Sequence, residues 1–281
     1  MKLSVWSAYY IDLSPEDMVL EFEKHGYKHC EFSDEHSLVL LERGNPLEEG
    51  KKFRAFADQH GISFSQGHLL LHARLRDSEW ISRLKDQLDL FRGMGIRYGV
   101  LHCDGMTDCP ELSQEEVFQI NVSALRELTD YIADTDMVIC LENLSAPLNR
   151  YAENLLELIN AVGDSHLGIC LDTGHLHLQE NTDQKAFIQT AGKHLKALHL
   201  ADNEGERDQH MMPFGKGKVN FMEVVTELKK IGYDGLYNLE IPGERRAPLP
   251  IRGMKLEYLK QVFAYLDQET KTKGEDSVDS L

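Results

Sequence analysis

The sequence is poor in basic residues. It contains 30 Lys and Arg against 47 Asp and Glu, which gives a formal net charge of −17. Such a surface repels phosphate backbones and anionic lipid, so neither a nucleic acid nor a membrane is expected as a partner. The sequence also lacks any apolar run of the length that a membrane span requires.

Cysteine is sparse as well. The five cysteines are odd in number and include no CxxC pair, which argues against a disulfide framework and favours a reducing compartment. Because the first residues, MKLSVWSAYYIDLSPED, contain no long apolar stretch, we expect a cytoplasmic protein. Cys30, Cys140 and Cys170 lie in apolar runs and are interpreted as small core residues.

A glycine-rich phosphate turn after an early strand, which a doubly wound sheet would favour, is also missing. The sequence contains instead eight short β-rich runs, separated by segments with the apolar spacing of helices. These runs are 3–6, 27–32, 62–68, 97–102, 137–142, 167–172, 196–200 and 235–241. Nearly all are too apolar to face water on one side, as in a parallel sheet covered by helices. The predicted fold is α/β, a single (β/α)8 TIM barrel over residues 1–268, followed by a polar tail at 269–281.

Local signals mark where the helices begin and end. Ser14 precedes Pro15, and Ser113 precedes Glu116 by three residues, both typical of helix starts. Glycines 26, 61, 95 and 232 each stand just before a predicted strand, as expected where a helix ends.

The ends of the predicted strands are unusually polar. Active sites of such barrels lie at the carboxyl ends of the strands, so these side chains are expected to meet at one mouth. They are His68, His102, Glu142, Asp172 with His175 just beyond, His199 and Glu240, and the loop after His199 adds Asp208 and His210. Carboxylates packed together would repel one another, and a divalent cation removes that conflict. Carboxylate and imidazole ligands without thiolate fit Mn²⁺, Mg²⁺, Co²⁺ or Zn²⁺ alike.

The motifs ICLDTGH (169–175), CLEN (140–143), HLADNEGERDQH with GKG (199–217) and LEI (239–241) resemble those of the xylose isomerase-like TIM barrel superfamily. That superfamily includes sugar-phosphate isomerases and epimerases, ketose 3-epimerases and endonuclease IV. The resemblance implies one metal bound by Glu142, Asp172, His199 and Glu240. It also implies that Glu142 and Glu240 act as acid and base on opposite faces of a sugar, which His175 contacts. Such an enzyme would abstract a proton next to a metal-bound carbonyl and pass through an enediolate.

Endonuclease IV holds three zinc ions, and the resemblance extends to its ligands. His68, His102, His175, Asp208 and His210 would then be additional ligands. The charge of −17 argues against a duplex partner, because gripping DNA requires a basic face. His68 and His102 are equally candidates for contacting a sugar.

Several other residues allow two interpretations. Trp6, Tyr10 and Phe32 fit either the core or an apolar wall for a sugar, and Glu31 and His36 fit either the surface or a position behind the ligands. Arg207 could reach a substrate hydroxyl or phosphate, or lie in solvent.

The leading hypothesis is a metal-dependent isomerase or epimerase of carbohydrate metabolism, acting on a keto sugar, sugar phosphate or related polyol. A lyase, dehydratase or glycoside-cleaving enzyme with the same metal site is an alternative. A phosphodiesterase on abasic DNA and a catalytically inactive binding subunit are two further ones. Members of the superfamily are often homo-oligomers, but no interface can be identified from this sequence.

Overall fold

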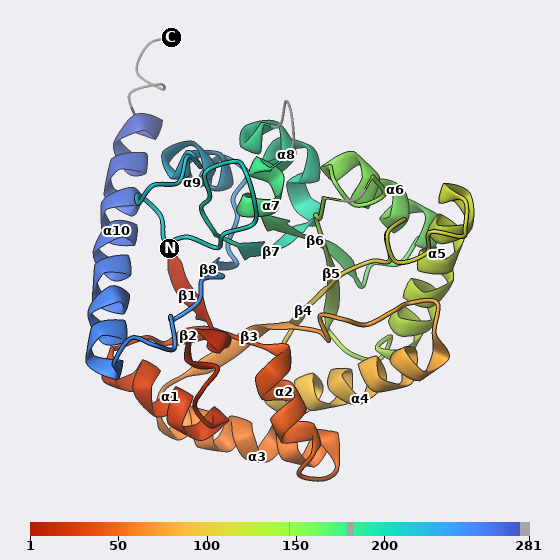
Figure 1. Ribbon diagram of the computed structural model, residues 1–281, viewed down its shortest axis with the longest axis horizontal. Coiled ribbons are helices and arrows are strands. Elements are labelled where there is room, and N and C mark those ends of the chain that lie inside the picture. Colours follow the sequence, from red (N-terminus) through yellow and green to blue (C-terminus); the bar gives the residue numbers. More distant parts are fainter. Residues whose placement is uncertain (146, 179–182, 276–281) are drawn as a thin grey trace.

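The computed structural model describes residues 1–145, 147–178 and 183–275. All eight predicted strands are present and pair in parallel in the order β7-β6-β5-β4-β3-β2-β1-β8 (Figure 1). They are β1 (Lys2–Trp6), β2 (His29–Phe32), β3 (Ser63–His68), β4 (Tyr98–Leu101), β5 (Val138–Glu142), β6 (Leu167–Asp172), β7 (Leu195–His199) and β8 (Leu236–Leu239). An isolated bridge between Leu200 and Leu239 joins the two ends of the sheet. The fold is therefore a single (β/α)8 barrel, as predicted.

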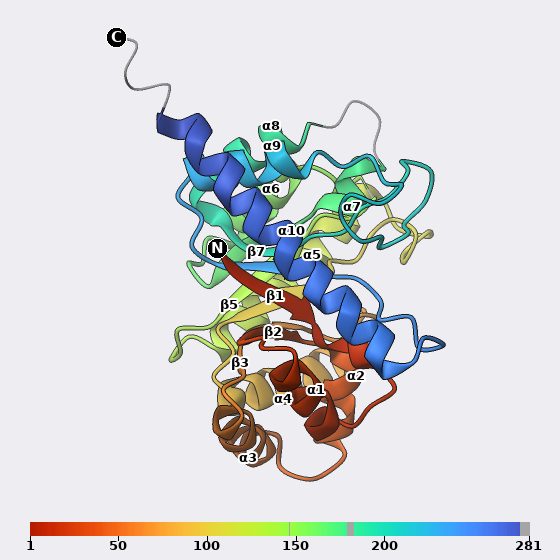
Figure 2. The same ribbon diagram turned by 90° about the vertical axis from the view of Figure 1, so that its left-hand side faces the viewer.

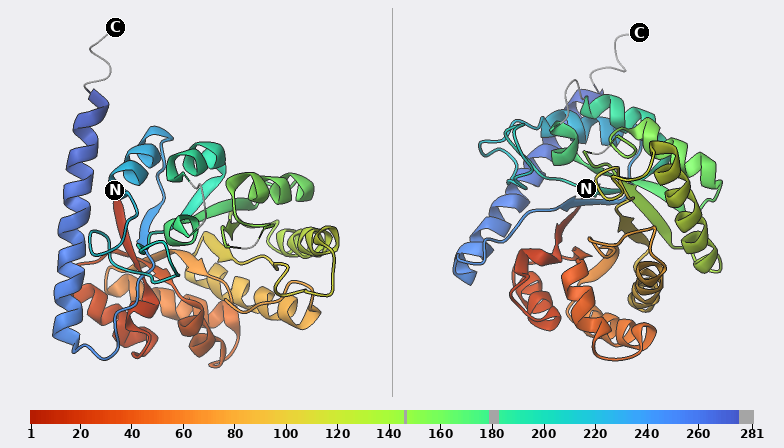
Figure 3. Two further views of the ribbon diagram at one scale, coloured as in Figure 1. Left: turned by 45° about the horizontal axis from the view of Figure 1, so that its top comes forward. Right: turned by 45° about the vertical axis from the view of Figure 1, so that its right-hand side comes forward.

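The helices form a ring outside the strands (Figure 3). They are α1 (Pro15–Lys24), α2 (Asp34–Leu41), α3 (Pro46–Gln59), α4 (Ser78–Met94), α5 (Gln114–Tyr131), α6 (Ala152–Val162), α7 (Thr173–His177), α8 (Gln184–Ala191), α9 (Phe221–Lys230) and α10 (Leu249–Glu275), with short 3₁₀ turns η1 (Ser7–Tyr10) and η2 (Gly192–His194). None of the described helices is long and apolar enough to cross a lipid bilayer.

The predicted helix boundaries are confirmed. Ser14 Oγ accepts a hydrogen bond from the Asp17 amide at 3.1 Å, and Ser113 and Glu116 form a reciprocal capping box. Each of the four predicted glycine stops has a φ between 69° and 77°, a left-handed conformation that glycine adopts without strain.

The C-terminal helix is longer than predicted. Helix α10 runs along one side of the barrel (Figure 2) and continues through Glu275, so it extends into the segment 269–281 that composition predicts as a tail. Within it Thr270 is buried and its hydroxyl donates to the Leu266 carbonyl, an intrahelical bond that the polar composition of this segment does not reveal. Residues 276–281 lie outside the described residues, and a tail there stays a prediction.

Small side chains form a buried cluster inside the barrel. Val100, Cys140, Cys170 and Ala197, on four adjacent strands, form a buried cluster separate from the large core between strands and helices. All five cysteines are buried and free, in line with the prediction of no disulfide framework. Because side chains alternate along a strand, residues two positions further along point into the same interior.

Candidate metal centre and active site

The pleat of the strands directs the polar strand ends into the barrel. Glu142, Asp172 and His199 each lie two residues beyond a member of the interior cluster, so their side chains point to the same face. His102 and Glu240 follow β4 and β8 by one residue, because those strands end at Leu101 and Leu239, one and two residues earlier than the predicted ends. Strand β7 is likewise shifted by one residue, because it covers Leu195–His199 where the sequence predicts 196–200.

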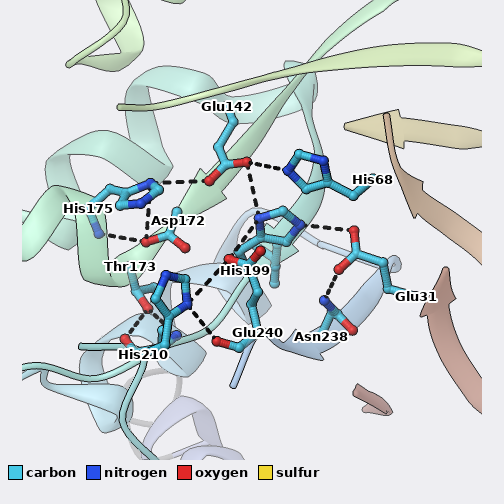
Figure 4. A network of polar contacts seen from close by, with 12 residues as sticks. Glu31, His68, Glu142, Asp172, Thr173, His175, His199, His210, Asn238 and Glu240 are labelled. Carbon is cyan, nitrogen blue, oxygen red and sulfur yellow. Dashed lines mark hydrogen bonds and ion pairs between the residues drawn. The ribbon is translucent and has the colours of Figure 1, made fainter. Parts of the chain in front are cut away.

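Four of these residues form a compact buried group. Ligand atoms of Glu142, Asp172, His199 and Glu240 all lie within 4.8 Å of one another. The Nδ1 atom of His199 is 3.2 Å from Glu142 Oε2 and 3.3 Å from Glu240 Oε2, so the two glutamates lie on either side of it (Figure 4). This is the set that the family resemblance implies as the metal site.

The group contains polar atoms that the protein leaves without hydrogen bonds. Asp172 Oδ2, His199 Nδ1, Glu240 Oε2 and, beside them, His68 Nε2 are buried and have no hydrogen-bond partner. Such atoms are costly in a protein interior unless another group satisfies them. Three carboxylates and an imidazole directed at one point fit a divalent cation that prefers oxygen and nitrogen ligands.

The two glutamates differ in their electrostatic surroundings. Burial raises the pKa of Glu240 to about 7, although His199 and His210 oppose that effect. Burial acts on Glu142 too, but His199 and His102 outweigh it and hold the pKa of this carboxyl well below its usual value. Two carboxyls of one site are thus biased toward different protonation states.

The remaining candidate ligands form two further groups around the first. His68 joins Glu142 and His199 in one group, and His102 Nε2 lies 3.0 Å from Glu142 Oε2. In the other group, Asp208 Oδ2 is 3.2 Å from His175 Nε2 and 2.9 Å from His210 Nε2. All nine predicted ligands therefore meet at one mouth.

Two of these histidines are oriented by the backbone. His68 Nδ1 lies 2.5 Å from the Leu69 carbonyl, and His210 Nδ1 lies 2.9 Å from the Glu240 carbonyl. A carbonyl only accepts hydrogen bonds, so each Nδ1 carries a proton and donates it. This leaves each Nε2 on the side of the candidate carboxylate ligands, where its lone pair could bind a cation that they share.

A cavity of about 360 Å³ opens above these groups. Trp6 lines it, whereas Tyr10 and Phe32 are fully buried in the core. Arg207 is exposed and is not one of the lining residues. The cavity is lined by Trp6, Asp34, His68, Leu71, His102, Glu142, His175, Asp208, Gln209, His210, Glu240 and Pro242.

Sequence reasoning missed Asp34, Leu71, Gln209 and Pro242. Asp34 is the first residue of α2 and follows the N-cap Ser33. From the sequence alone it cannot be told apart from the acidic residues that are common in the first turn of a helix. Gln209 could have been found, because it lies between the predicted ligands Asp208 and His210.

Glu31 lies behind His199 and is fully buried, so the surface interpretation of this residue is wrong. Its carboxylate accepts hydrogen bonds from His199 Nε2 at 2.9 Å, from Gln66 Nε2 at 3.0 Å and from the Asn238 side-chain amide (Figure 4). Because a carboxylate only accepts, His199 keeps a proton on Nε2 and can present the lone pair of Nδ1 to a cation. Glu31 is thus a positioning residue for His199.

Replacing Glu31 by Gln should weaken metal binding without unfolding the protein. The amide has nearly the same volume but is a weaker acceptor and carries no charge, so His199 loses its fixed orientation. We expect the Kd for Mn²⁺, measured by calorimetric titration, to rise roughly 10- to 100-fold. The exposed Glu42→Gln at the end of α2 serves as the control. An unchanged Mn²⁺ affinity in Glu31→Gln would contradict this role.

The sequence matches the family model described as xylose isomerase-like TIM barrel over residues 19–262. The chain belongs to this family. The resemblance seen in its motifs is thereby confirmed.

The chain also matches individual proteins, at modest sequence identity. The chain is 34% identical over 169 residues to protein MJ1311 of Methanocaldococcus jannaschii, a match that covers 58% of this chain and only 57% of that protein. It is 26% identical over 232 residues to the inosose isomerase of Bacillus velezensis, covering 78% of this chain and 80% of that enzyme. The crystal structure of D-psicose 3-epimerase with D-tagatose from Clostridium cellulolyticum H10 superposes with a TM-score of 0.79 at 17% identity, covering 95% of this chain and 99% of that one. This last likeness concerns the fold alone.

Proposed function

We propose that the protein is a divalent-metal-dependent isomerase or epimerase of a keto sugar or related polyol. The observation that carries the proposal is the buried group of Glu142, Asp172, His199 and Glu240 at the base of a cavity. The similarity to an inosose isomerase and the fold of a ketose epimerase support it.

The same four residues would hold the cation. The unpartnered buried atoms of Asp172, His199 and Glu240, with the Glu142 carboxylate beside them, fit Mn²⁺, Mg²⁺, Co²⁺ or Zn²⁺ without preference. When bound, the cation would supply Lewis acidity toward the negative charge that develops on a substrate carbonyl oxygen as the neighbouring C–H bond breaks.

The protein's own residues would carry the proton. Glu142 ends β5 and Glu240 follows β8, with two strands between them, so the carboxyls approach a substrate from different parts of the mouth. A carboxylate on one side removes the α-proton, and the carboxyl on the other side returns a proton to the same or the adjacent carbon. His175, Nδ1 of which is 3.1 Å from Glu142 Oε1, is placed to orient the substrate.

Removal of the same proton can also end in elimination. A lyase or dehydratase would share the first step and differ only in losing a β-substituent instead of regaining a proton. Product analysis is therefore part of the test.

The test is incubation of the metal-loaded protein with a panel of ketoses in deuterated water. We expect deuterium to enter next to the carbonyl and an isomer or epimer to accumulate, as NMR would report. Exchange followed by loss of water or of a leaving group would favour the elimination alternative. The absence of exchange with every ketone would refute the proposal.

A second candidate function is hydrolysis of a phosphodiester. The observation that favours it is the convergence of eight candidate ligands in three groups, two of which share Glu142 and His199, enough for more than one cation. Against it stand the net charge of −17 and the absence of Lys and Arg among the described residues that line the cavity.

Metal content separates the two functions. We expect elemental analysis of the purified protein to give one divalent metal per chain, and no submicromolar binding to an abasic DNA duplex at physiological salt. Three metals per chain together with tight, salt-sensitive duplex binding would replace the isomerase proposal by the hydrolase.

A further inference from the structure

Three residues of the cavity wall on the side of β1 to β3 lie outside the candidate metal groups. Trp6 is the last residue of β1, Asp34 begins α2 directly after β2, and Leu71 follows β3. These side chains share the cavity with the glutamates, and a substrate held at the metal group would extend toward them.

Trp6 brings a hydrogen-bond donor with no partner. Its indole Nε1 is buried and has no hydrogen bond, although the residue lines the cavity. An indole N–H can only donate, so its natural partner is an oxygen. A substrate hydroxyl in the cavity would supply that oxygen.

Asp34 brings an acceptor. The residue is only 8% exposed, and its Oδ2 accepts the Leu71 amide at 3.2 Å, which holds the carboxylate at the cavity wall. A carboxylate has about four acceptor positions, so it can also receive a hydroxyl proton. A hydroxyl group both donates and accepts, and Trp6 with Asp34 offers one partner for each role.

The described lining of the cavity lacks the Lys and Arg side chains that usually bind an anionic substrate. Among the described residues no lining side chain is Lys or Arg, and the nearby Arg207 is exposed. A phosphate group would therefore find no ammonium or guanidinium group among the described lining residues to bind it.

We propose that Trp6 and Asp34 form a subsite for hydroxyl groups remote from the reacting carbonyl, and that the substrate is an uncharged polyhydroxy ketone. This inference rests on the proposed isomerase or epimerase function. Trp6 Nε1–H donates to one hydroxyl oxygen, and the Asp34 carboxylate accepts a proton from a hydroxyl.

The test compares two variants on a long and a truncated substrate. The long probe is whichever of fructose, psicose, tagatose and sorbose exchanges its α-proton fastest with the metal-loaded protein. The truncated probe is dihydroxyacetone, which has no remote hydroxyls. We expect Trp6→Phe and Asp34→Asn each to lower kcat/KM for exchange about 10-fold more with the ketohexose than with dihydroxyacetone.

The chain provides a matched control. Its other tryptophan, Trp80, lies on α4 outside the cavity with the Arg83 guanidinium over its ring, so Trp80→Phe should not change the ratio between the two probes. Thermal unfolding of every variant separates a loss of stability, which would affect both probes equally, from a loss of hydroxyl recognition.

Three results would overturn the inference. Equal losses with both probes would show that Trp6 and Asp34 do not contact remote hydroxyls. A higher kcat/KM for the 6-phosphate of the ketohexose than for the free sugar would refute the uncharged substrate while leaving the isomerase proposal intact. No exchange with any ketone would overturn the proposed function and this inference together.

Discussion

Glu142→Gln and Glu240→Gln are each expected to lose turnover by a factor of about 10²–10⁴, the usual contribution of a proton-transferring group. Glutamine keeps an oxygen ligand and nearly the same volume but has no basic site. Both variants should therefore hold metal weakly or moderately and still bind substrate, while α-proton exchange fails with turnover. Bound metal, substrate affinity and exchange are the three measurements.

Two comparison variants make this result specific. Glu206→Gln changes an exposed glutamate in the loop after β7 and should behave like the unmodified protein. His175→Ala should mainly weaken and misplace the substrate while leaving some exchange, because His175 orients rather than carries the proton in this mechanism. Near-normal turnover in both glutamine variants would rule out proton transfer by these residues and favour hydrolysis.

Asp172→Ala is expected to abolish stoichiometric metal binding and activity together. Asp172 is fully buried, and its Oδ2 is one of the unpartnered atoms directed at the metal group. Its other oxygen, Oδ1, accepts the His175 amide at 2.5 Å and so caps the short helix α7. The alanine variant should therefore also lose about 1 kcal/mol of stability, the usual value of an N-cap, and remain folded.

Asp172→Asn separates these two roles. The asparagine oxygen can still cap α7, so the melting temperature of Asp172→Asn should be closer to that of the unmodified protein than the melting temperature of Asp172→Ala is. The metal content of Asp172→Asn should nevertheless fall, because the negative charge of the ligand is gone. Elemental analysis and thermal unfolding measure the two effects. Full metal retention by the alanine variant would refute the assignment of Asp172 as a ligand.

The barrel and its polar mouth could be predicted because their signals are local. An apolar run that ends in Glu142 or Asp172 places a charge at a strand tip whatever the rest of the chain does. The parallel topology then brings such tips together. The capping residues Ser14 and Ser113 are equally local, since each contacts a residue three positions away.

The environment of individual side chains could not be predicted in the same way. Glu31 stands in a four-residue strand, and only partners 35 and more positions away, Gln66, His199 and Asn238, show that its carboxylate is buried and satisfied. Trp6 and Tyr10 are four residues apart, yet one lines the cavity and the other lies in the core. The difference depends on how η1 turns the chain after β1, which the composition of SAYY does not reveal.

We call the junction between β7 and β8 the seam of the barrel, because an isolated bridge takes the place of a longer strand pairing there. Strands β7 and β8 meet through the bridge between Leu200 and Leu239, with backbone bonds from Leu200 N to Asn238 O at 2.8 Å and from Glu240 N to Leu200 O at 3.2 Å. His199 and Glu240 stand on the two sides of this seam, 3.3 Å apart. A cation ligated by both residues, as proposed above, would join the two strands, so opening the seam would release the ion and ion binding would resist the opening. Metal binding would thereby also hold β7 and β8 together, and we expect metal-free protein to open first between these two strands.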